Sequence, residues 1–133
     1  MVDATLSVLQ KALEMRMREH EIHASNIANA NVPNYKARKL DFEGRLREAI
    51  AGLDGAPNEP LLAREARAEA QVPSVAPDIY EDPTAVASGD GNTVNAEREQ
   101  TALAKNTVAY ETLVEMMKMK FAMQKMAISE GGR

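Results

Sequence analysis

The chain contains no cysteine and no tryptophan, and only two of its 133 residues are phenylalanine. Without cysteine, disulfides, thiolate zinc sites and cysteine nucleophiles are excluded. With so few aromatic residues, much of the apolar volume must come from eight methionines. Their flexible side chains suit contacts between helices better than a compact aromatic core.

An excess of positive charge is also absent, since the formal net charge is -4 at pH 7. A chain of this charge has little with which to neutralise phosphates, so nucleic acid is not an expected partner. No apolar run approaches the ~20 residues that span a bilayer, and no direct membrane insertion is expected. The N-terminal residues lack the basic start, apolar centre and cleavage site of a secretory signal, so any export is expected to occur without a cleavable signal peptide.

Residues 1–32 predict a long helix. Apolar residues recur at heptad spacing, and Pro33 disfavours helical geometry at the residue before it, so the helix should end near residues 29–31. Asp3 or Thr5 can cap its start. The repeating positions are Leu6, Leu13, His20 and Ile27.

Residues 95–133 predict a second long helix, which Asn95 can cap. One stripe of this helix follows a 4-3-4-3 spacing, which is typical of the contact face of a coiled coil. The stripe consists of Leu103, Thr107, Tyr110, Val114, Met117, Phe121, Gln124 and Ile128.

Two further segments lie between these helices. Residues 33–53 predict a turn and a short amphipathic helix, with Asp41 as its cap and one apolar face made of Phe42, Leu46, Ile50 and Leu53. Residues 54–94 hold five of the six prolines and predict an exposed, acidic Pro/Ala-rich insertion, partly disordered, with scope for a short helix at LLAREARAEA. The predicted fold is therefore all-α, with the long terminal helices paired as a coiled-coil-like hairpin around a loop-rich middle.

Patterns for catalysis or for metal binding are weak. His20 and His23 are three residues apart rather than four, and no third ligand accompanies them. The SGDGNT segment fits neither a phosphate-binding loop nor a calcium loop, and is better explained as the turn before the second helix. No acid–base pair or activated nucleophile can be nominated. We expect no enzymatic activity, no cofactor and no metal.

The stretch ASNIANANVPNYKARKLDF, residues 24–42, has a structural interpretation. Pro33 fixes φ at the second position of a β-turn, and Asn34 tolerates positive φ at the third. Asn29 and Asn31 can satisfy free backbone groups at the helix end. The segment should stop the helix and redirect the chain sharply.

The same stretch resembles the N-terminal signature of flagellar axial proteins, in which an Ala-Asn-Ile-Ala-Asn-Ala core leads into a Pro-Gly-Tyr turn. Asn34 stands where the signature usually has glycine, and Val32 stands where a polar residue is common. The tail, DGNTVNAEREQTALAKNTVAYETLVEMMKMKFAMQKMAI, is similar to that of proximal rod proteins, where a Gly-Asn-x-Val turn leads into a long helix. Both ends of the chain are covered, and the middle is not.

This resemblance to the flagellar basal-body rod protein family implies a structural subunit of the proximal rod, which assembles helically to transmit torque for motility. The implied partners are further copies of the chain, other rod proteins, the rod–membrane-ring junction protein and the flagellar type III export apparatus. The implied location is the periplasmic rod of the basal body.

Two sets of residues are expected to serve this assembly. The turn and assembly motif comprises Asn26, Asn29, Asn31, Pro33, Asn34 and Tyr35. The subunit-interface seam comprises Leu6, Leu13, Ile27, Leu103, Tyr110, Val114, Met117, Phe121 and Ile128. The alternatives are another flagellar axial subunit, or a helical adaptor that docks its Met-rich C-terminal helix on a partner or a membrane.

Overall fold

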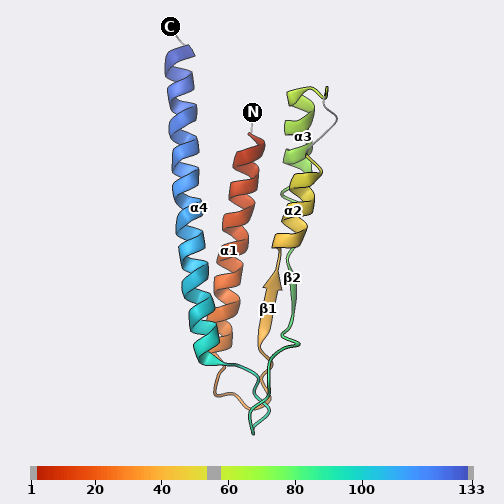
Figure 1. The fold of residues 1–133 in the computed structure, drawn as a ribbon, viewed down its shortest axis with the longest axis vertical. Helices are drawn as coiled ribbons and strands as arrows, with labels where there is room; N and C mark the ends of the chain where they lie inside the picture. The colour runs from red at the N-terminus through yellow and green to blue at the C-terminus, as the bar shows by residue number, and fades with distance from the viewer. Residues whose placement is uncertain (1–2, 54–57, 132–133) are drawn as a thin grey trace.

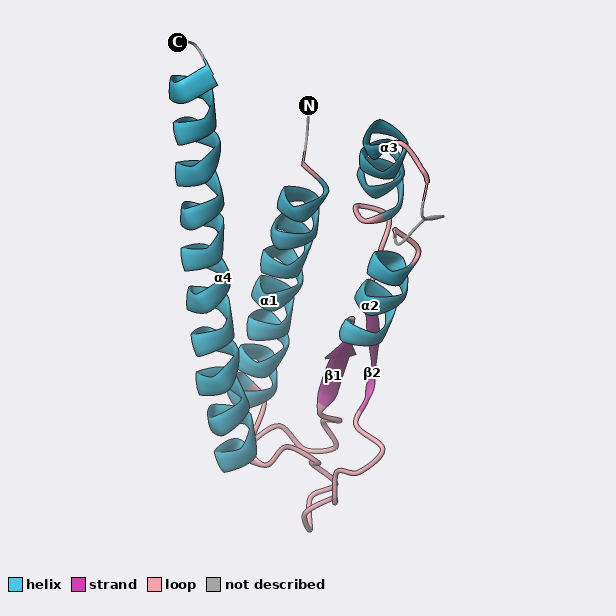
Figure 2. Ribbon diagram, turned by 45° about the horizontal axis from the view of Figure 1, so that its top comes forward, coloured by secondary structure: helices cyan, strands magenta, loops and turns pink. Residues whose placement is uncertain are grey.

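A computed structural model describes residues 3–53 and 58–131 of the chain. In chain order its elements are α1 (Ala4–Ala28), β1 (Arg38–Asp41), α2 (Glu43–Ala51), α3 (Leu61–Gln71), β2 (Asp78–Glu81) and α4 (Ala96–Gly131). They form three columns, in which α1 lies between α4 and a column built from the two strands, α2 and α3 (Figures 1 and 2). The mainly helical fold with long terminal helices is confirmed. The all-α description is wrong in one respect, because two strands pair.

The ends of α1 follow from local chemistry. The Asp3 carboxylate accepts a hydrogen bond from the backbone N–H of Thr5 at 2.8 Å, which caps the first turn. At the other end, Asn29 is the C-cap, and its side-chain amide donates to the Ser25 carbonyl at 2.8 Å. The predicted end of the helix near residues 29–31 is confirmed.

Helix α4 runs antiparallel to α1, and three contacts along the pair keep the two helices in step. His23 meets Glu99 at 2.7 Å, the Asn106 side chain donates to the Arg16 carbonyl at 2.8 Å, and Lys120 forms an ion pair with Asp3. At 1.5 Å per residue, α1 is about 38 Å long and α4 about 54 Å. Since Asp3 lies level with Lys120, the turns of α4 after Lys120 extend beyond α1 (Figure 1).

The hydrophobic core lies between α1 and the α2–α3 column, not between the two long helices. Met15 of α1 and Val72, which ends α3, are completely buried in it. The cluster consists of Ala12, Met15, Phe42, Leu46, Leu53, Ala68 and Val72. Each large side chain buried in this cluster contributes about 1.5–3 kcal/mol.

Most of residues 58–94 are exposed, but the description of residues 54–94 as an insertion overlooked strand β2 and the packing of α3 against α1. Ala68 and Val72 lie four residues apart on one face of α3, and both are buried against α1. The charged and proline-rich composition concealed this two-residue apolar contact. Residues 54–57 of the segment, and residues 1–2 and 132–133 of the predicted terminal helices, lie outside the described residues.

The two strands pair in antiparallel register, with Arg38 opposite Glu81 and Asp41 opposite Asp78. Asp41 is thus part of β1 and does not cap α2, contrary to the prediction. The N-cap is Phe42, whose side chain has no hydrogen-bonding atom to cap the helix and is instead buried in the core. Phe42, Leu46 and Leu53 form the buried face as expected, whereas Ile50 remains exposed.

Candidate functional site: the asparagine junction

Two loops that are far apart in the sequence meet at the end of the molecule where α1 finishes and α4 begins (Figure 1). One is the loop after α1, and the other is the turn at residues 90–93 that precedes α4. We call this region the asparagine junction and define it by Asn26, Asn29, Asn34, Tyr35, Asn92 and Thr93. Backbone and side-chain hydrogen bonds between the loops hold it together.

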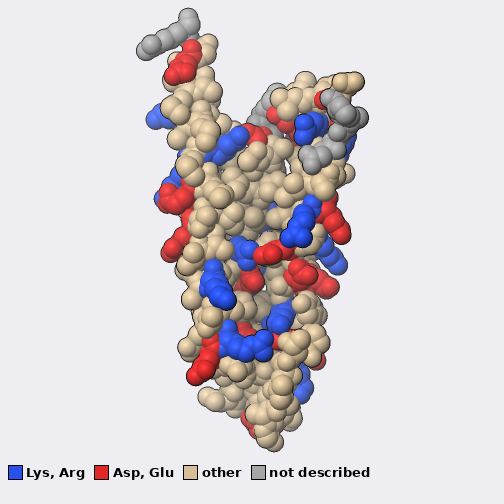
Figure 3. Space-filling view, viewed as in Figure 1, with Lys and Arg blue, Asp and Glu red and all other residues tan. Residues whose placement is uncertain are grey.

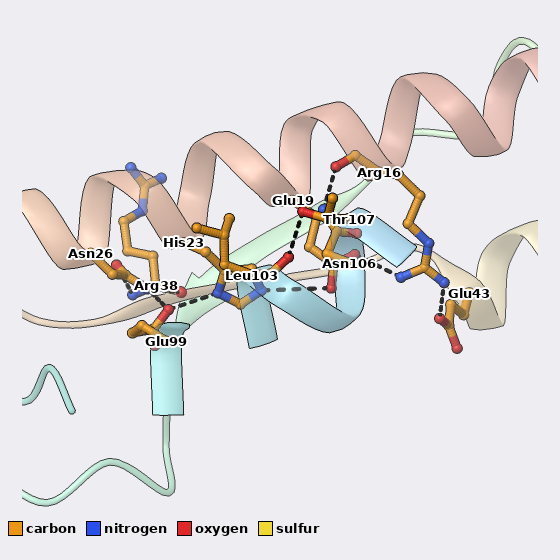
Figure 4. Close-up of polar contacts among 10 residues, drawn as sticks. All are labelled: Arg16, Glu19, His23, Asn26, Arg38, Glu43, Glu99, Leu103, Asn106 and Thr107. Carbon is orange, nitrogen blue, oxygen red and sulfur yellow. Dashed lines mark hydrogen bonds and ion pairs between the residues drawn. The ribbon is translucent and has the colours of Figure 1, made fainter. Parts of the chain in front are cut away.

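Asn26 is completely buried at the centre of the junction. Its side-chain amide donates to the Arg38 carbonyl at 2.8 Å and to Glu99 Oε2 at 3.1 Å. Its oxygen accepts from the Arg38 backbone N–H at 3.0 Å and from the Tyr35 hydroxyl at 3.3 Å. These four bonds use both donors and both acceptor positions of the amide. One side chain therefore joins α1 to β1, to the turn and to α4 (Figure 4).

Asn92 performs the corresponding task from the other loop, and only 3% of it is exposed. Its side-chain amide donates to the carbonyls of Asn29 at 2.9 Å and Val32 at 2.7 Å. Each of these carbonyls also accepts a backbone N–H, so Asn92 adds a second hydrogen bond to each and ties the loop before α4 to the loop after α1. From the sequence alone, Asn92 is expected only in a turn. The Gly-Asn-x-Val resemblance was the signal that could have identified it.

The turn at residues 32–35 has the expected conformation. Asn34 has a φ of 63°, and the Tyr35 N–H closes the turn onto the Val32 carbonyl at 3.3 Å. Opposite it, Gly91 has a φ of 81°, and a Cβ atom there would collide with Asn34 Oδ1. The two left-handed residues thus fit against each other, and only glycine fits at position 91.

Further bonds fasten the turn to the loop before α4. The Asn34 N–H donates to the Asp90 carbonyl and the Thr93 N–H donates to the Tyr35 carbonyl, both at 3.0 Å. The Ala37 N–H donates to Thr93 Oγ1 at 2.8 Å. By contrast, Asn31 and Pro33 are exposed, and Asn31 makes no side-chain hydrogen bond to the residues that the structure describes. The predicted motif therefore contains both junction residues and surface residues.

We expect Asn34→Gly to leave the free energy of unfolding nearly unchanged, and Asn34→Val to lower it by about 1–2 kcal/mol or more. Glycine adopts positive φ freely, whereas left-handed geometry costs an ordinary L-residue about that much and a β-branched residue more. Denaturant unfolding of the two variants at one pH is the measurement. Equal stability of N34G and N34V would show that the positive φ is not required.

A chain of charged side chains runs along α1 beside the junction (Figure 4). Arg16 bridges Glu19 at 2.8 Å and Glu43 at 2.7 Å, and His23 contacts Glu99 at 2.7 Å and Glu19 at 3.9 Å. The pKa of His23 is raised above its ordinary value, first by Glu19 and then by Glu99, although burial opposes the shift. Burial alone would raise the pKa of Glu19, but His23 and Arg16 outweigh it and lower that pKa.

The residues of the predicted seam are only partly covered within one chain. Most are half-buried, while Phe121 and Ile128 are 49% and 77% exposed. Among the described residues of α4, the single buried side chain is Asn106, not an apolar one. The half-buried members are Leu6, Leu13, Ile27, Leu103, Tyr110, Val114 and Met117.

Within residues 3–53 and 58–131, no cluster of His, Asp or Glu is suited to hold a metal ion. None of the helices in that part of the chain is sufficiently long and apolar to cross a membrane. Positive and negative side chains are interspersed over the face in Figure 3, without a large patch of one sign. The junction positions backbone segments and does not present a reactive group.

Comparison with known proteins agrees with this arrangement. Residues 6–36 match the model of the family described as flagella basal body rod protein. The chain is 33% identical over 122 residues to the flagellar basal body rod protein FlgB of Aeromonas hydrophila, covering 90% of this chain and 89% of the relative. It is 37% identical over 114 residues to FlgB of Escherichia coli (83% and 82% of the two chains) and 36% identical over 119 residues to FlgB of Cereibacter sphaeroides (88% of each). The chain belongs to the FlgB family of flagellar basal body rod proteins.

Proposed function

We propose that the chain is a structural subunit of the proximal rod of the bacterial flagellar basal body, and that it assembles helically with other rod proteins to transmit torque for motility. The observation that carries this proposal is identity of 33–37% to FlgB proteins over 82–89% of their length. The family model covers residues 6–36, which include Asn26, Asn29, Asn34 and Tyr35 of the asparagine junction. A structural role of this kind is not enzymatic.

The exposed apolar surface of α4 supports assembly through this helix. Beyond Lys120 the helix has no α1 beside it, and a monomer rarely leaves so many large apolar side chains uncovered without a partner. The exposed residues there are Phe121, Met123, Met126 and Ile128. We infer that neighbouring subunits cover them and complete a coiled-coil-like packing along the seam defined above.

When identical subunits contact each other through different surfaces, they form a closed ring only if the rotation between neighbours closes. Otherwise the same contact repeats into an open helical assembly. The antiparallel α1–α4 pair would supply the axial contacts, and the column of β1, β2, α2 and α3 would lie to one side of it. The asparagine junction would fix the angle between these parts, because Asn26 bonds to β1 and α4 and Asn92 bonds to the loop after α1.

The proposal extends to location and partners. We place the subunit in the periplasmic part of the basal body, exported by the flagellar type III apparatus without a cleavable signal peptide. Its neighbours would be further copies of the chain, other rod proteins and the rod–membrane-ring junction protein. Membership of the FlgB family supports these assignments.

Mass spectrometry of purified basal bodies with lysine cross-linking tests the proposal. Lys118 and Lys125 are exposed near the free end of α4, so we expect them to cross-link to rod or ring proteins. Lys36 lies at the opposite end of the molecule, and its cross-links serve as the comparison with those of Lys118 and Lys125. Absence of the chain from complete basal bodies would overturn the assignment.

The exposed methionines of α4 also fit a second candidate, a helical adaptor that docks this helix on a membrane. Met116, Met119, Met123 and Met126 are each about half exposed. Flotation of the purified chain with anionic liposomes separates the two functions. A rod subunit has no need to bind liposomes, whereas a membrane-docking adaptor must bind them and rise with the vesicles.

A further inference from the structure

His23 lies between two carboxylates that belong to different helices. Its Nδ1 is 2.7 Å from Glu99 Oε2 on α4, and its Nε2 is 3.9 Å from Glu19 Oε1 on α1. The His23 and Glu99 side chains are each only 12% exposed, so water screens their contact poorly. Figure 4 shows the imidazole lying between the two acids.

The number of protons on the ring decides whether both contacts are favourable. A neutral imidazole has one N–H donor and one lone pair, so one of its nitrogens must face a carboxylate without a proton between them. An imidazolium donates from both nitrogens and carries a positive charge between the two negative ones. At 3.9 Å the Nε2–Glu19 contact is an ion pair rather than a hydrogen bond, so it is attractive only when the ring is protonated, and a charged ring also strengthens the contact with Glu99.

No other positively charged group that the structure describes around His23 supplies the charge that the protonated ring brings between Glu19 and Glu99. Arg16 is already shared between Glu19 and Glu43, and Lys39 of β1 pairs with Asp82 at 3.0 Å. Arg98 of α4 lines the same cavity of about 230 Å³ as His23, Lys39 and Asp82, but it is exposed and forms no ion pair with the described residues. Among the described groups, the direct link between Glu99 and α1 consists of His23 and Asn26.

We propose that protonated His23 is a latch that holds the start of α4 against α1 and that releases this end of α4 when the proton is lost. Glu99 lies in the first turn of α4 and shares its Oε2 between His23 and Asn26, so release also weakens the link between α4 and the asparagine junction. If the chain assembles through a paired α1 and α4, as proposed above, the latch sets the pH range in which the subunit is ready to assemble. That last step rests on the proposed function, whereas the latch itself does not.

The pH window follows from the directions of the shifts. The folded-state pKa of His23 is raised, so the stabilisation is complete below the ordinary histidine pKa, near 6.5, and disappears as pH rises through the higher folded value. The pKa of Glu19 is lowered, so that carboxylate remains charged below its own ordinary range. The latch should thus be closed in mildly acidic solution and open in alkaline solution.

Amide hydrogen exchange at the start of α4 tests this, with rates corrected for the intrinsic effect of pH. In the unaltered chain we expect protection of the amides around Glu99 to fall between pH 6 and pH 9, by about tenfold for each pKa unit by which folding raises His23. His23→Gln should abolish this dependence, because glutamine has no proton to lose in this range. His20→Gln is the matched control, since His20 is exposed and forms no ion pair with the described residues; it should retain the full dependence.

Protection that is independent of pH in the unaltered chain, or an equal fall in H23Q, would overturn the latch. NMR titration of the unaltered chain keeps the test decisive if H23Q does not fold, because a folded-state pKa of His23 at or below the ordinary histidine value, near 6.5, also overturns it. The rod function is judged separately by the basal-body experiment. If hydrogen exchange shows the latch but the chain is absent from basal bodies, the latch proposal stands and the proposed rod function fails.

Discussion

Asn26→Ala is expected to lower the free energy of unfolding by about 3–5 kcal/mol, the largest loss we anticipate for any polar side chain. The variant removes four hydrogen bonds and leaves the Arg38 N–H and carbonyl and the Tyr35 hydroxyl without their shared partner. A buried group that loses its partner costs about 1–3 kcal/mol, and water has little access because Asn26 is 0% exposed. The α1, β1 and α4 segments would all lose their common point of attachment.

Denaturant unfolding followed by circular dichroism measures this loss, and Asn31→Ala is the matched control. Asn31 occurs in the same motif but is exposed and makes no side-chain hydrogen bond to described residues, so its change should stay within about 0.5 kcal/mol. Asn26→Asp adds a second comparison. It keeps the acceptors but places a carboxylate next to Glu99 Oε2, and it should be almost as unstable as N26A. Similar stability of N26A and N31A would contradict the role assigned to the junction.

The features that could be predicted from the sequence are those that depend on neighbouring residues. The Asp3 cap, the end of α1 at Asn29 and the left-handed Asn34 each arise from the preferences of a few consecutive residues. The same is true of Asn95, whose side chain accepts from the Arg98 N–H at 3.0 Å at the start of α4. Local chemistry therefore located both ends of α1 and the start of α4.

The features that were missed depend on partners distant in the sequence. The two strands, residues 38–41 and 78–81, pair although most of the middle segment separates them in the sequence. Each strand is too short and too charged to show an alternating pattern. Val72 is an isolated apolar residue until α3 places it beside α1. Asn26 was identified as part of a motif, but its partners Arg38 and Glu99 come from β1 and α4. Only the folded arrangement shows why a helix would bury an asparagine.

Phe121→Asp is expected to abolish swimming while leaving the isolated subunit folded. The side chain is 49% exposed and lies on the part of α4 that extends beyond α1. Its replacement therefore disturbs little within one chain, and we expect a loss in unfolding free energy of no more than about 1 kcal/mol. In the proposed rod, the same position is covered by a neighbouring subunit. Burying an unpaired carboxylate in such a contact is strongly unfavourable, and every subunit in the assembly carries it.

Swimming in soft agar, with rod content of basal bodies as the second readout, measures the effect. Val108→Asp is the matched control, since Val108 is 63% exposed on the same helix but lies outside the predicted seam. If any aspartate on the surface of α4 prevented assembly, both variants would be immotile. Normal swimming of F121D would remove Phe121 from the subunit interface. Loss in F121D alone, at normal cellular levels of a folded protein, would instead localise an assembly contact to the free end of α4, because the chain itself does not use this side chain in its core.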